Sequence, residues 1–284
     1  MTDKAGHREC IGLIAGSGRF PLLFAQEAKR QGARVVAIGL KGVTDGSLSE
    51  FADEVHTFRL GQVSGPLKTL KKAGVRRVVM AGKVRHVSLF GGILPDLRAA
   101  KILAKLKDGR TDTILKAVAD EFLSEGLELI SSSTYLSHMM PGPGVLTRRK
   151  PTKSETADIR IGWRAAKTVS GQDIGQSVAV RDKAVIAVEA MEGTDAMLKR
   201  AGELSRSFGR EPGIVLVKVA KPGQDFRFDL PVLGLDSLKA FEEARVTAVA
   251  LEAGKTMLFD REDFIRKADE LKMAIIAHED GEVG

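Results

Sequence analysis

The opening of the chain alternates apolar runs with a glycine loop and a helical pattern, and this order restricts the possible folds. The apolar run Cys10–Ala15 predicts a strand, Gly16-Ser17-Gly18 predicts a loop, and residues 20–31 predict a helix with Pro21 in its first turn. A second apolar run at residues 34–39 predicts the next strand. A strand, a helix and another strand in this order are typical of a parallel sheet with helices on its faces.

A stretch dense in proline and glycine, Met139-Met140-Pro141-Gly142-Pro143-Gly144, marks the clearest linker. We therefore predict a two-domain α/β fold. Residues 1–146 form an N-terminal Rossmann-like domain with a parallel sheet and helices. Residues 147–284 form a C-terminal mixed α/β domain, in which residues 177–180 and 184–188 are expected to pair as a hairpin.

The glycine loop does not match the dinucleotide-binding pattern. It reads Gly16-x-Gly18-x-x-Pro21, without the third glycine, and the next strand ends in Gly39-Leu40-Lys41, without an acid for a ribose. This argues against a nucleotide-dependent oxidoreductase. A uridine nucleotide or sugar phosphate bound by Gly16, Ser17 and Gly18 stays open, and so does a plain tight turn.

Two basic residues, Lys83 and Arg85, follow the apolar strand predicted at residues 75–81. Residues just past the carboxyl ends of parallel strands line the ligand crevice of such sheets. We therefore expect Lys83 and Arg85 to contact a phosphate of the substrate.

The charge and composition favour an anionic partner that is not nucleic acid. The formal net charge is +7, but aromatic residues make up only 5% of the chain and are not interleaved with a dense basic stripe.

A single cysteine, Cys10, excludes an internal disulfide and fits a reducing compartment. No signal-peptide pattern opens the chain and no apolar run approaches the ~18 residues of a membrane span. We expect a cytoplasmic protein that contacts the inner membrane at most peripherally, with a homodimer as the default assembly.

The segment Lys221–Leu230 follows a buried strand and carries the most distinctive set of polar side chains. Lys221-Pro222-Gly223 must turn, and in an extended chain Asp225, Arg227 and Asp229 would share one face. This face is expected to meet phosphate and a metal ion. The alternative is a strand-end turn whose charges are solvated and paired with Arg227.

A second acidic segment, Glu189-Ala-Met-Glu-Gly-Thr-Asp195, reads as a strand end, a glycine turn and a helix start. Thr194 or Asp195 would cap the helix, and a helix N-terminus suits an anionic phosphate. Ordinary capping explains Asp195 alone, but it does not require Glu189 or Glu192.

The motifs present and absent in the sequence leave few possible classes of reaction. The sequence shows no GxSxG elbow for acyl hydrolysis and no CxxC or HExxH pattern for zinc. Carboxylates beside basic residues at strand ends suit Mg²⁺-dependent attack of water on a phosphoanhydride.

These motifs resemble those of the LpxI-type UDP-2,3-diacylglucosamine pyrophosphatases of lipid A biosynthesis. The resemblance rests on Glu189–Asp195, on residues 218–231, on Gly12-Leu-Ile-Ala-Gly-Ser-Gly18 with Pro21, and on Gly144-Val-Leu-Thr147. It implies hydrolysis of an amphiphilic UDP-sugar lipid to UMP and 2,3-diacylglucosamine 1-phosphate (lipid X), with Mg²⁺ or Mn²⁺ as cofactor. It also implies that water attacks the phosphorus on the sugar side and that the aspartate matching Asp225 is essential.

We combine these observations in one hypothesis. Asp225 holds the ion or positions the attacking water, Lys221 and Arg227 contact phosphate, and Gln224 orients water or substrate. Thr194 contacts the substrate. The expected metal ligands are Asp225, Glu189, Glu192 and Asp195. The alternative function is a nucleotide-sugar or lipid carrier or sensor that binds without turnover.

Overall fold

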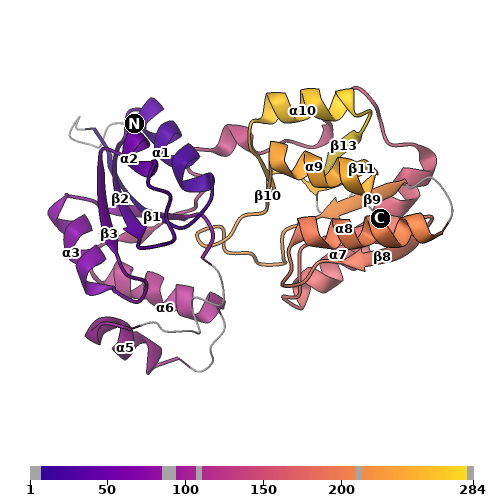
Figure 1. The fold of residues 1–284 in the computed structure, drawn as a ribbon. Helices are drawn as coiled ribbons and strands as arrows, with labels where there is room; N and C mark the ends of the chain where they lie inside the picture. Colours follow the sequence, from indigo (N-terminus) through magenta and orange to yellow (C-terminus); the bar gives the residue numbers. More distant parts are fainter. Residues whose placement is uncertain (1–7, 85–93, 107–110, 209–212, 280–284) are drawn as a thin grey trace. The chain divides into compact units, whose positions relative to one another are not determined.

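A computed structural model describes residues 8–84, 94–106, 111–208 and 213–279 of the chain (Figure 1). The chain divides into two compact units. The first comprises Met1–Leu136 together with Asp225–Asp229, and the second comprises Ser137–Gln224 together with Leu230–Gly284. The segment around Asp225 therefore leaves the second unit, joins the first and returns.

The N-terminal unit is built on a five-stranded parallel sheet with strand order β3-β2-β1-β4-β5. The strands are β1 (Cys10–Ala15), β2 (Arg34–Leu40), β3 (Glu54–Phe58), β4 (Arg77–Ala81) and β5 (Glu128–Leu129). The three central strands are rich in buried Val, Ile, Leu and Ala, as expected where helices cover both faces of a parallel sheet. The strand order reverses between β1 and β4, so the loops that follow these two strands lie where such sheets bind ligands.

Helices cover both faces of this sheet. They are α1 (Phe20–Arg30), α2 (Leu48–Phe51), α3 (Ser64–Lys72), α5 (Leu97–Leu103) and α6 (Thr111–Ser124). Val36 and Ile38 of β2 share a core cluster with buried residues of α3, α5 and α6. Phe24 of α1 packs edge-to-face on Tyr135, with ring centroids 5.6 Å apart.

The C-terminal unit contains a six-stranded mixed sheet with strand order β6-β13-β11-β9-β7-β8. β9 (Ile214–Lys218), β11 (Val246–Glu252) and β13 (Ala274–His278) run parallel. β6 (Gly144–Val145), β7 (Ser177–Arg181) and β8 (Ala184–Val188) pair with antiparallel neighbours. β10 (Val232–Leu233) and β12 (Met257–Leu258) form a separate parallel pair.

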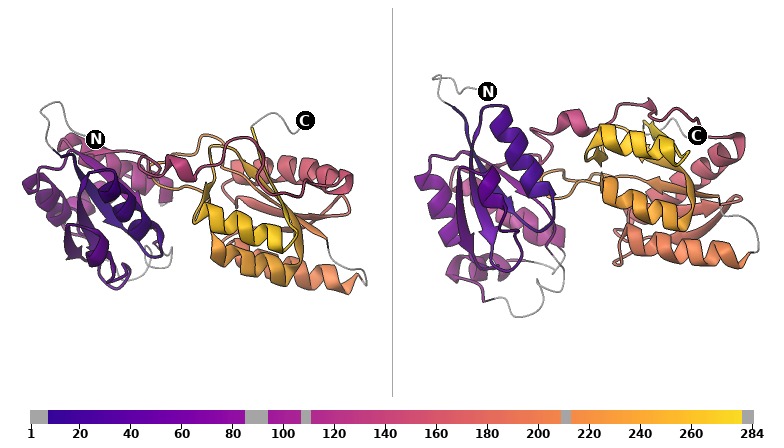
Figure 2. Two further views of the ribbon diagram at one scale, coloured as in Figure 1. Left: turned by 90° about the horizontal axis from the view of Figure 1, so that it is seen from above. Right: turned by 45° about the horizontal axis from the view of Figure 1, so that its top comes forward.

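The mixed sheet is also covered on both faces. α7 (Lys153–Gly171) packs on one face through Ile159, Trp163 and Ala166. α8 (Thr194–Ser207), α9 (Leu235–Ala244) and α10 (Arg261–Glu270) share the core cluster of the other face. Figure 2 shows this arrangement, with the rose-coloured α7 across the sheet from the orange and yellow helices.

The predicted fold class is confirmed: a parallel sheet with helices in the first unit and a mixed α/β arrangement in the second. The predicted hairpin of residues 177–188 is present as β7 and β8. Among the residues that the structure describes, no helix combines the length and the apolar character that crossing a bilayer requires.

Candidate functional site

Asp225 lies in a tight turn in which Arg227 folds back onto its carboxylate. Nε and Nη2 of Arg227 donate hydrogen bonds of 2.9 and 2.6 Å to Oδ1 and Oδ2 of Asp225. The amides of Phe228 and Asp229 donate to the carbonyl of Asp225 at 3.0 and 3.4 Å. The segment is therefore not extended, so its three charged residues do not share one face, and the alternative of a strand-end turn with Asp225 paired to Arg227 is the one present.

The turn is attached to the N-terminal unit through its phenylalanines. The carbonyl of Phe226 accepts hydrogen bonds from the amide and hydroxyl of Ser132, at 3.1 and 3.2 Å. Phe228 packs against the core cluster of the same unit, and the guanidinium carbon of Arg227 lies 5.0 Å from its ring centroid. The aromatic residues thus hold the turn on the unit.

The ion pair keeps Asp225 charged. Hydrogen bonds from the Arg227 side chain, opposed by partial burial, lower the pKa of Asp225 below its ordinary value. The same hydrogen bonds raise the pKa of Arg227. Asp225 is therefore a carboxylate at neutral pH, and its side chain remains 39% exposed.

Lys221 and Gln224 precede this turn and belong to the C-terminal unit. Oε1 of Gln224 accepts hydrogen bonds from the Lys221 amide at 2.9 Å and from Nε2 of Gln176 at 3.3 Å. Nζ of Lys221 lies 3.1 Å from Oδ1 of Asp173. The side-chain carbonyl of Gln224 thus shapes the turn at Lys221-Pro222-Gly223.

The acidic segment at the start of α8 is held by its own partners. Oε1 of Glu189 accepts a hydrogen bond of 2.9 Å from the Thr194 hydroxyl. Glu192 accepts from the Ala190 amide at 3.0 Å and from Arg200 at 2.8 Å. Its pKa is lowered, first by its own backbone amide and then by Arg200. Asp195 is exposed in the first turn of the helix.

A buried amine, Nζ of Lys218, lies behind this segment at the end of β9. It donates to the hydroxyls of Thr194 and Ser177 at 2.9 and 3.1 Å, and it lies 3.8 Å from Oε2 of Glu189. Thr194 therefore links the amine to the Glu189 carboxylate. This network balances the charge of Lys218, which is only 6% exposed.

A second buried charge lies at the end of β11. Glu252 is fully buried, and its Oε1 accepts from Lys167 at 2.8 Å and from Lys255 at 2.6 Å. Its Oε2 accepts from the amide of Ala220, the residue before Lys221. Neither Lys218 nor Glu252 was predicted from the sequence as a site residue. The sequence signal that could have identified them is a charged residue at the end of an otherwise apolar strand, as at Glu189.

The glycine loop of the N-terminal unit pairs with the loop after β4. The amides of Gly16 and Ser17 donate to the carbonyls of Ala81 and Lys83, each at 2.8 Å. A Cβ added at Gly16 would lie 2.7 Å from the Lys83 carbonyl oxygen, so glycine is required for this close approach. Two amides of the loop are thus used within the unit. Gly18 has a φ of +89°, and Arg85 lies outside the described residues.

The predicted site residues therefore fall in both units. Asp225, Arg227 and the Gly16–Gly18 loop belong to the first. Lys221, Gln224 and the Glu189–Asp195 segment belong to the second. In the described parts of the chain, no three His, Cys, Asp or Glu side chains gather as a group that could hold a metal ion.

Asp225 nevertheless fits a Mg²⁺ ligand by its chemistry. It offers an ionised, partly exposed carboxylate, and Mg²⁺ is usually held by one or two carboxylates together with substrate phosphates. Glu189 and Glu192 instead lie against Lys218 and Arg200, which suits them to holding the start of α8.

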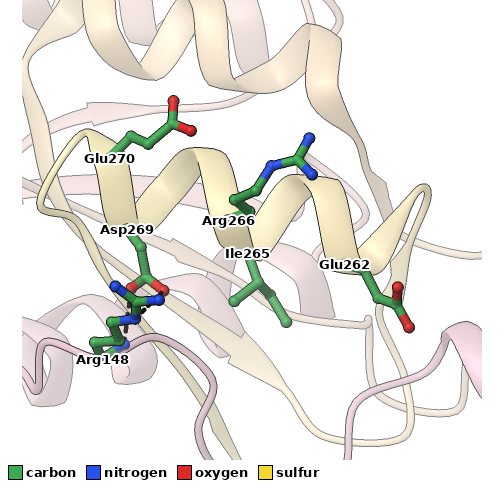
Figure 3. Close-up of a pocket in the computed structure, with 6 residues that line it drawn as sticks. All are labelled: Arg148, Glu262, Ile265, Arg266, Asp269 and Glu270. Atoms are coloured by element: carbon green, nitrogen blue, oxygen red, sulfur yellow. Dashed lines mark hydrogen bonds and ion pairs between the residues drawn. The ribbon is translucent and has the colours of Figure 1, made fainter.

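A pocket of about 560 Å³ lies along α10 in the C-terminal unit (Figure 3). Its lining residues are Arg148, Glu262, Ile265, Arg266, Asp269 and Glu270. The amide of Arg148 donates to Oδ1 of Asp269 at 2.8 Å, and the guanidinium reaches toward the same carboxylate. The predicted site residues do not line this pocket.

Comparison with known proteins identifies two matching domain families and a similar protein. The LpxI N-terminal domain family matches residues 10–139, and the LpxI C-terminal domain family matches residues 142–276. UDP-2,3-diacylglucosamine pyrophosphatase LpxI of Caulobacter vibrioides is 32% identical over 274 residues, covering 94% of this chain and 96% of the relative.

Solved structures give looser similarities. The biotin carboxylase domain of the Hydrogenobacter thermophilus 2-oxoglutarate carboxylase is 13% identical with a TM-score of 0.26, over 70% of this chain and 42% of that one. N5-carboxyaminoimidazole ribonucleotide synthetase from Thermotoga maritima is 17% identical with a TM-score of 0.24, over 66% of this chain and 43% of that one.

The fold is thus that of a two-unit α/β protein with ionisable side chains at the carboxyl ends of its strands. Because both domain families match and together cover most of its length, the chain belongs to the LpxI family.

Proposed function

We propose that this protein hydrolyses the diphosphate of UDP-2,3-diacylglucosamine, releasing UMP and 2,3-diacylglucosamine 1-phosphate (lipid X) for lipid A biosynthesis. The observation that carries the proposal is the relative of that activity, which is 32% identical and aligns over 94% of the chain. The paired Asp225 and Arg227 support it, because hydrolysis of a phosphoanhydride needs both an anionic group for a metal or water and cations for the phosphates.

In this proposal Asp225, together with the substrate diphosphate, would hold Mg²⁺, or Mn²⁺ in its place. When bound, the ion supplies charge neutralisation of the phosphate oxygens. Glu189, Glu192 and Asp195 were expected as further ligands. The contacts of Glu189 and Glu192 favour a supporting role in which Glu189 orients Thr194 toward the substrate and Glu192 fixes the turn before α8, and Asp195 stays a proposed ligand.

The basic residues would balance the negative charge of the substrate phosphates that the metal ion does not neutralise. Arg227 can offer its planar fork to a phosphate oxygen when the substrate competes for it, and Lys221 offers a single ammonium charge from the preceding turn. Gln224 orients water or substrate. Contacts to the nucleotide or sugar phosphate are proposed for Gly18, Lys83 and Arg85. Gly16 and Ser17 fix the shape of the glycine loop through their backbone hydrogen bonds.

The substrate carries two acyl chains, so we also propose that the enzyme works in the cytoplasm at the inner membrane surface as a peripheral protein, with a homodimer as its expected assembly.

The decisive measurement is UMP release from UDP-2,3-diacylglucosamine in detergent micelles, first with Mg²⁺ and then with EDTA. We expect release that EDTA stops and that added Mg²⁺ restores. Release that EDTA does not change would contradict the metal assignment while keeping the hydrolase.

The alternative is a carrier or sensor that binds the nucleotide-sugar lipid without turnover. It predicts saturable binding of the lipid with no UMP released under either condition. A binding module does not need an ionised aspartate held against an arginine, and this pair favours the hydrolase.

A further inference from the structure

The outward face of α5 in the N-terminal unit is both apolar and basic. Leu97 is 85% exposed and Leu94, just before the helix, is 78% exposed. Leu103 is also exposed, and so are Lys101 and Lys105. We call these five residues the α5 surface. Figure 1 shows α5 at the outer edge of its unit, beside α6.

The helix geometry separates this surface from the buried face. Ala99 and Ile102 are buried in the core cluster that contains Phe122 of α6. At 3.6 residues per turn, Leu97 and Lys101 lie one turn apart on the opposite side of the helix. Leu103 lies about 40° around the helix from Ala99, at the edge of the buried face, and Lys105 follows in the turn after the helix. Leu97 therefore points away from the core of its own unit, and Leu103 lies at the edge of the buried face and is 43% exposed.

Specific contacts hold α5 in this orientation. Nη2 of Arg98 donates to Oε1 of Glu125 at 2.6 Å, and Nε of Arg98 lies 3.1 Å from Oε1 of Glu121. Asp96 caps the helix by accepting from the Ala99 amide at 2.8 Å. The helix is thus fixed by its own cap and by α6, with Leu97 left outward.

The charge of this stretch is predominantly positive, with Arg98, Lys101 and Lys105. Residues 94–106 contain a single acid, Asp96. Its carboxylate also accepts hydrogen bonds from the amides of Val63 and Ser64, at 2.9 and 2.8 Å. Lys101 and Lys105 are exposed beside the leucines. By contrast, the exposed Leu123 of α6 lies in a sequence that also contains Asp120, Glu121 and Glu125.

Exposed leucines flanked by lysines match the surface of a bilayer that contains anionic lipids. The leucines can enter the boundary between headgroups and acyl chains, while the ammonium groups stay at the level of the lipid phosphates. Each lysine near such a surface adds attraction that salt weakens. A protein partner would satisfy the apolar part alone, without requiring the one-sided charge.

We propose that the α5 surface docks this protein on an anionic phospholipid bilayer. This docking surface deepens the proposed location at the inner membrane and rests on it, but it does not depend on the hydrolysis reaction, because it concerns binding to lipid that is not the substrate. It identifies one short helix as the place where the protein meets the membrane.

The test is co-sedimentation of the full chain with vesicles of phosphatidylglycerol, and separately with vesicles of phosphatidylcholine. We expect binding to the anionic vesicles that weakens as salt is raised. The double variants Leu97→Ser/Leu103→Ser and Lys101→Glu/Lys105→Glu should each lower the affinity for phosphatidylglycerol by about tenfold or more.

Matched controls come from α8. Leu204 is 41% exposed, close to the 43% of Leu103, and Lys199 is exposed on the same helix. Leu204→Ser and Lys199→Glu should leave vesicle binding unchanged. UMP release from detergent-solubilised substrate, measured on every variant, reports folding and enzymatic function separately from docking.

Three results would overturn the proposal: no binding to phosphatidylglycerol, equal binding by wild type and both double variants, or equal loss of binding in the α8 controls. A fourth is a shift from dimer to monomer in Leu97→Ser/Leu103→Ser without any vesicle binding by the wild type, since this would show that a second copy covers the α5 surface.

Discussion

The amide of Ala220 donates a hydrogen bond of 2.9 Å to Oε2 of Glu252, whose carboxylate is fully buried. The other oxygen of Glu252 accepts from Lys167 of α7 and from Lys255 of the turn after β11. One carboxylate therefore joins three segments of the C-terminal unit. One of these segments leads directly into Lys221 and the turn that precedes Asp225.

Replacing Glu252 with glutamine should destabilise the C-terminal unit by about 3–5 kcal/mol, because two lysines lose the buried charge that balances them. Trp163 is the only tryptophan and lies buried in α7, so its fluorescence during urea unfolding reports this unit. The exposed Glu262→Gln is the matched control and should change stability by less than about 0.5 kcal/mol. Equal unfolding midpoints for Glu252→Gln and wild type would contradict the role given to this carboxylate.

Asp225→Asn should lower the rate of UMP release by about 10²–10³-fold, the usual cost of removing one electrostatic group from a reacting centre. The side chain is partly exposed and its amide replacement keeps the shape, so the unfolding transition should stay close to that of wild type. Asp236→Asn, on the exposed first turn of α9, should keep full activity. An active Asp225→Asn enzyme would remove Asp225 from the proposed chemistry.

Arg227→Gln should move the acid limb of the pH–rate profile to higher pH. Hydrogen bonds from Arg227 lower the pKa of Asp225, so the wild-type carboxylate stays ionised as the pH falls. Without the arginine, the pKa rises toward the ordinary aspartate value of ~3.9, and the ionised form is lost at a higher pH. The measurement is kcat/KM between about pH 3 and 7. The control is Arg164→Gln, at an exposed arginine. If the pH profiles of Arg227→Gln and wild type superimpose, or if Arg164→Gln shifts the acid limb equally, Asp225 does not control this limb.

Much of the fold follows from local patterns. The apolar run, glycine loop and helix at residues 10–31 are local features, and they produce β1, its loop and α1 as predicted. The hairpin of β7 and β8 is equally local, because Asp182 and Lys183 at its turn have φ values of 49° and 66°. Such turns depend on residues close in sequence.

The candidate site depends instead on contacts between distant positions. Alternating polar and aromatic residues after Gln224 suggested an extended segment. The carbonyl of Phe226 is held by Ser132, 94 positions away, and Arg227 folds onto Asp225. Glu252 meets Lys167 across 85 positions. The turn with Asp225 paired to Arg227 was one of the two alternatives that the local sequence allowed. A local pattern cannot identify the distant partners, so the attachment of Phe226 to Ser132 and the buried contacts of Glu252 were not predictable from it.

Glu155→Gln should destabilise the C-terminal unit by about 3 kcal/mol at neutral pH. Burial acts to raise the pKa of Glu155, but hydrogen bonds from Arg149 and from the Thr152 amide outweigh it and lower the pKa to about 2. Because the folded-state pKa lies below the unfolded value, the stabilisation is complete above about pH 4.5 and is lost as the pH falls toward about 2. The difference between wild type and variant should therefore narrow between about pH 4.5 and 2, followed by Trp163 fluorescence. A constant difference, or the same trend in the exposed Glu203→Gln, would contradict this linkage.

Gly82→Ala should destabilise the N-terminal unit by at least ~2 kcal/mol. Gly82 has a φ of +92°, and a Cβ there would lie 2.7 Å from the carbonyl oxygen of Ser17. The backbone pairing of Ser17 with Lys83, which closes the ends of β1 and β4, must then open. Hydrogen exchange should rise in peptides from these two strands and stay unchanged in β9 and β11. Gly46→Ala is the control, because a Cβ there meets nothing within 4 Å. If hydrogen exchange in β1 and β4 is the same in Gly82→Ala as in this control, the close approach at Gly82 is not required.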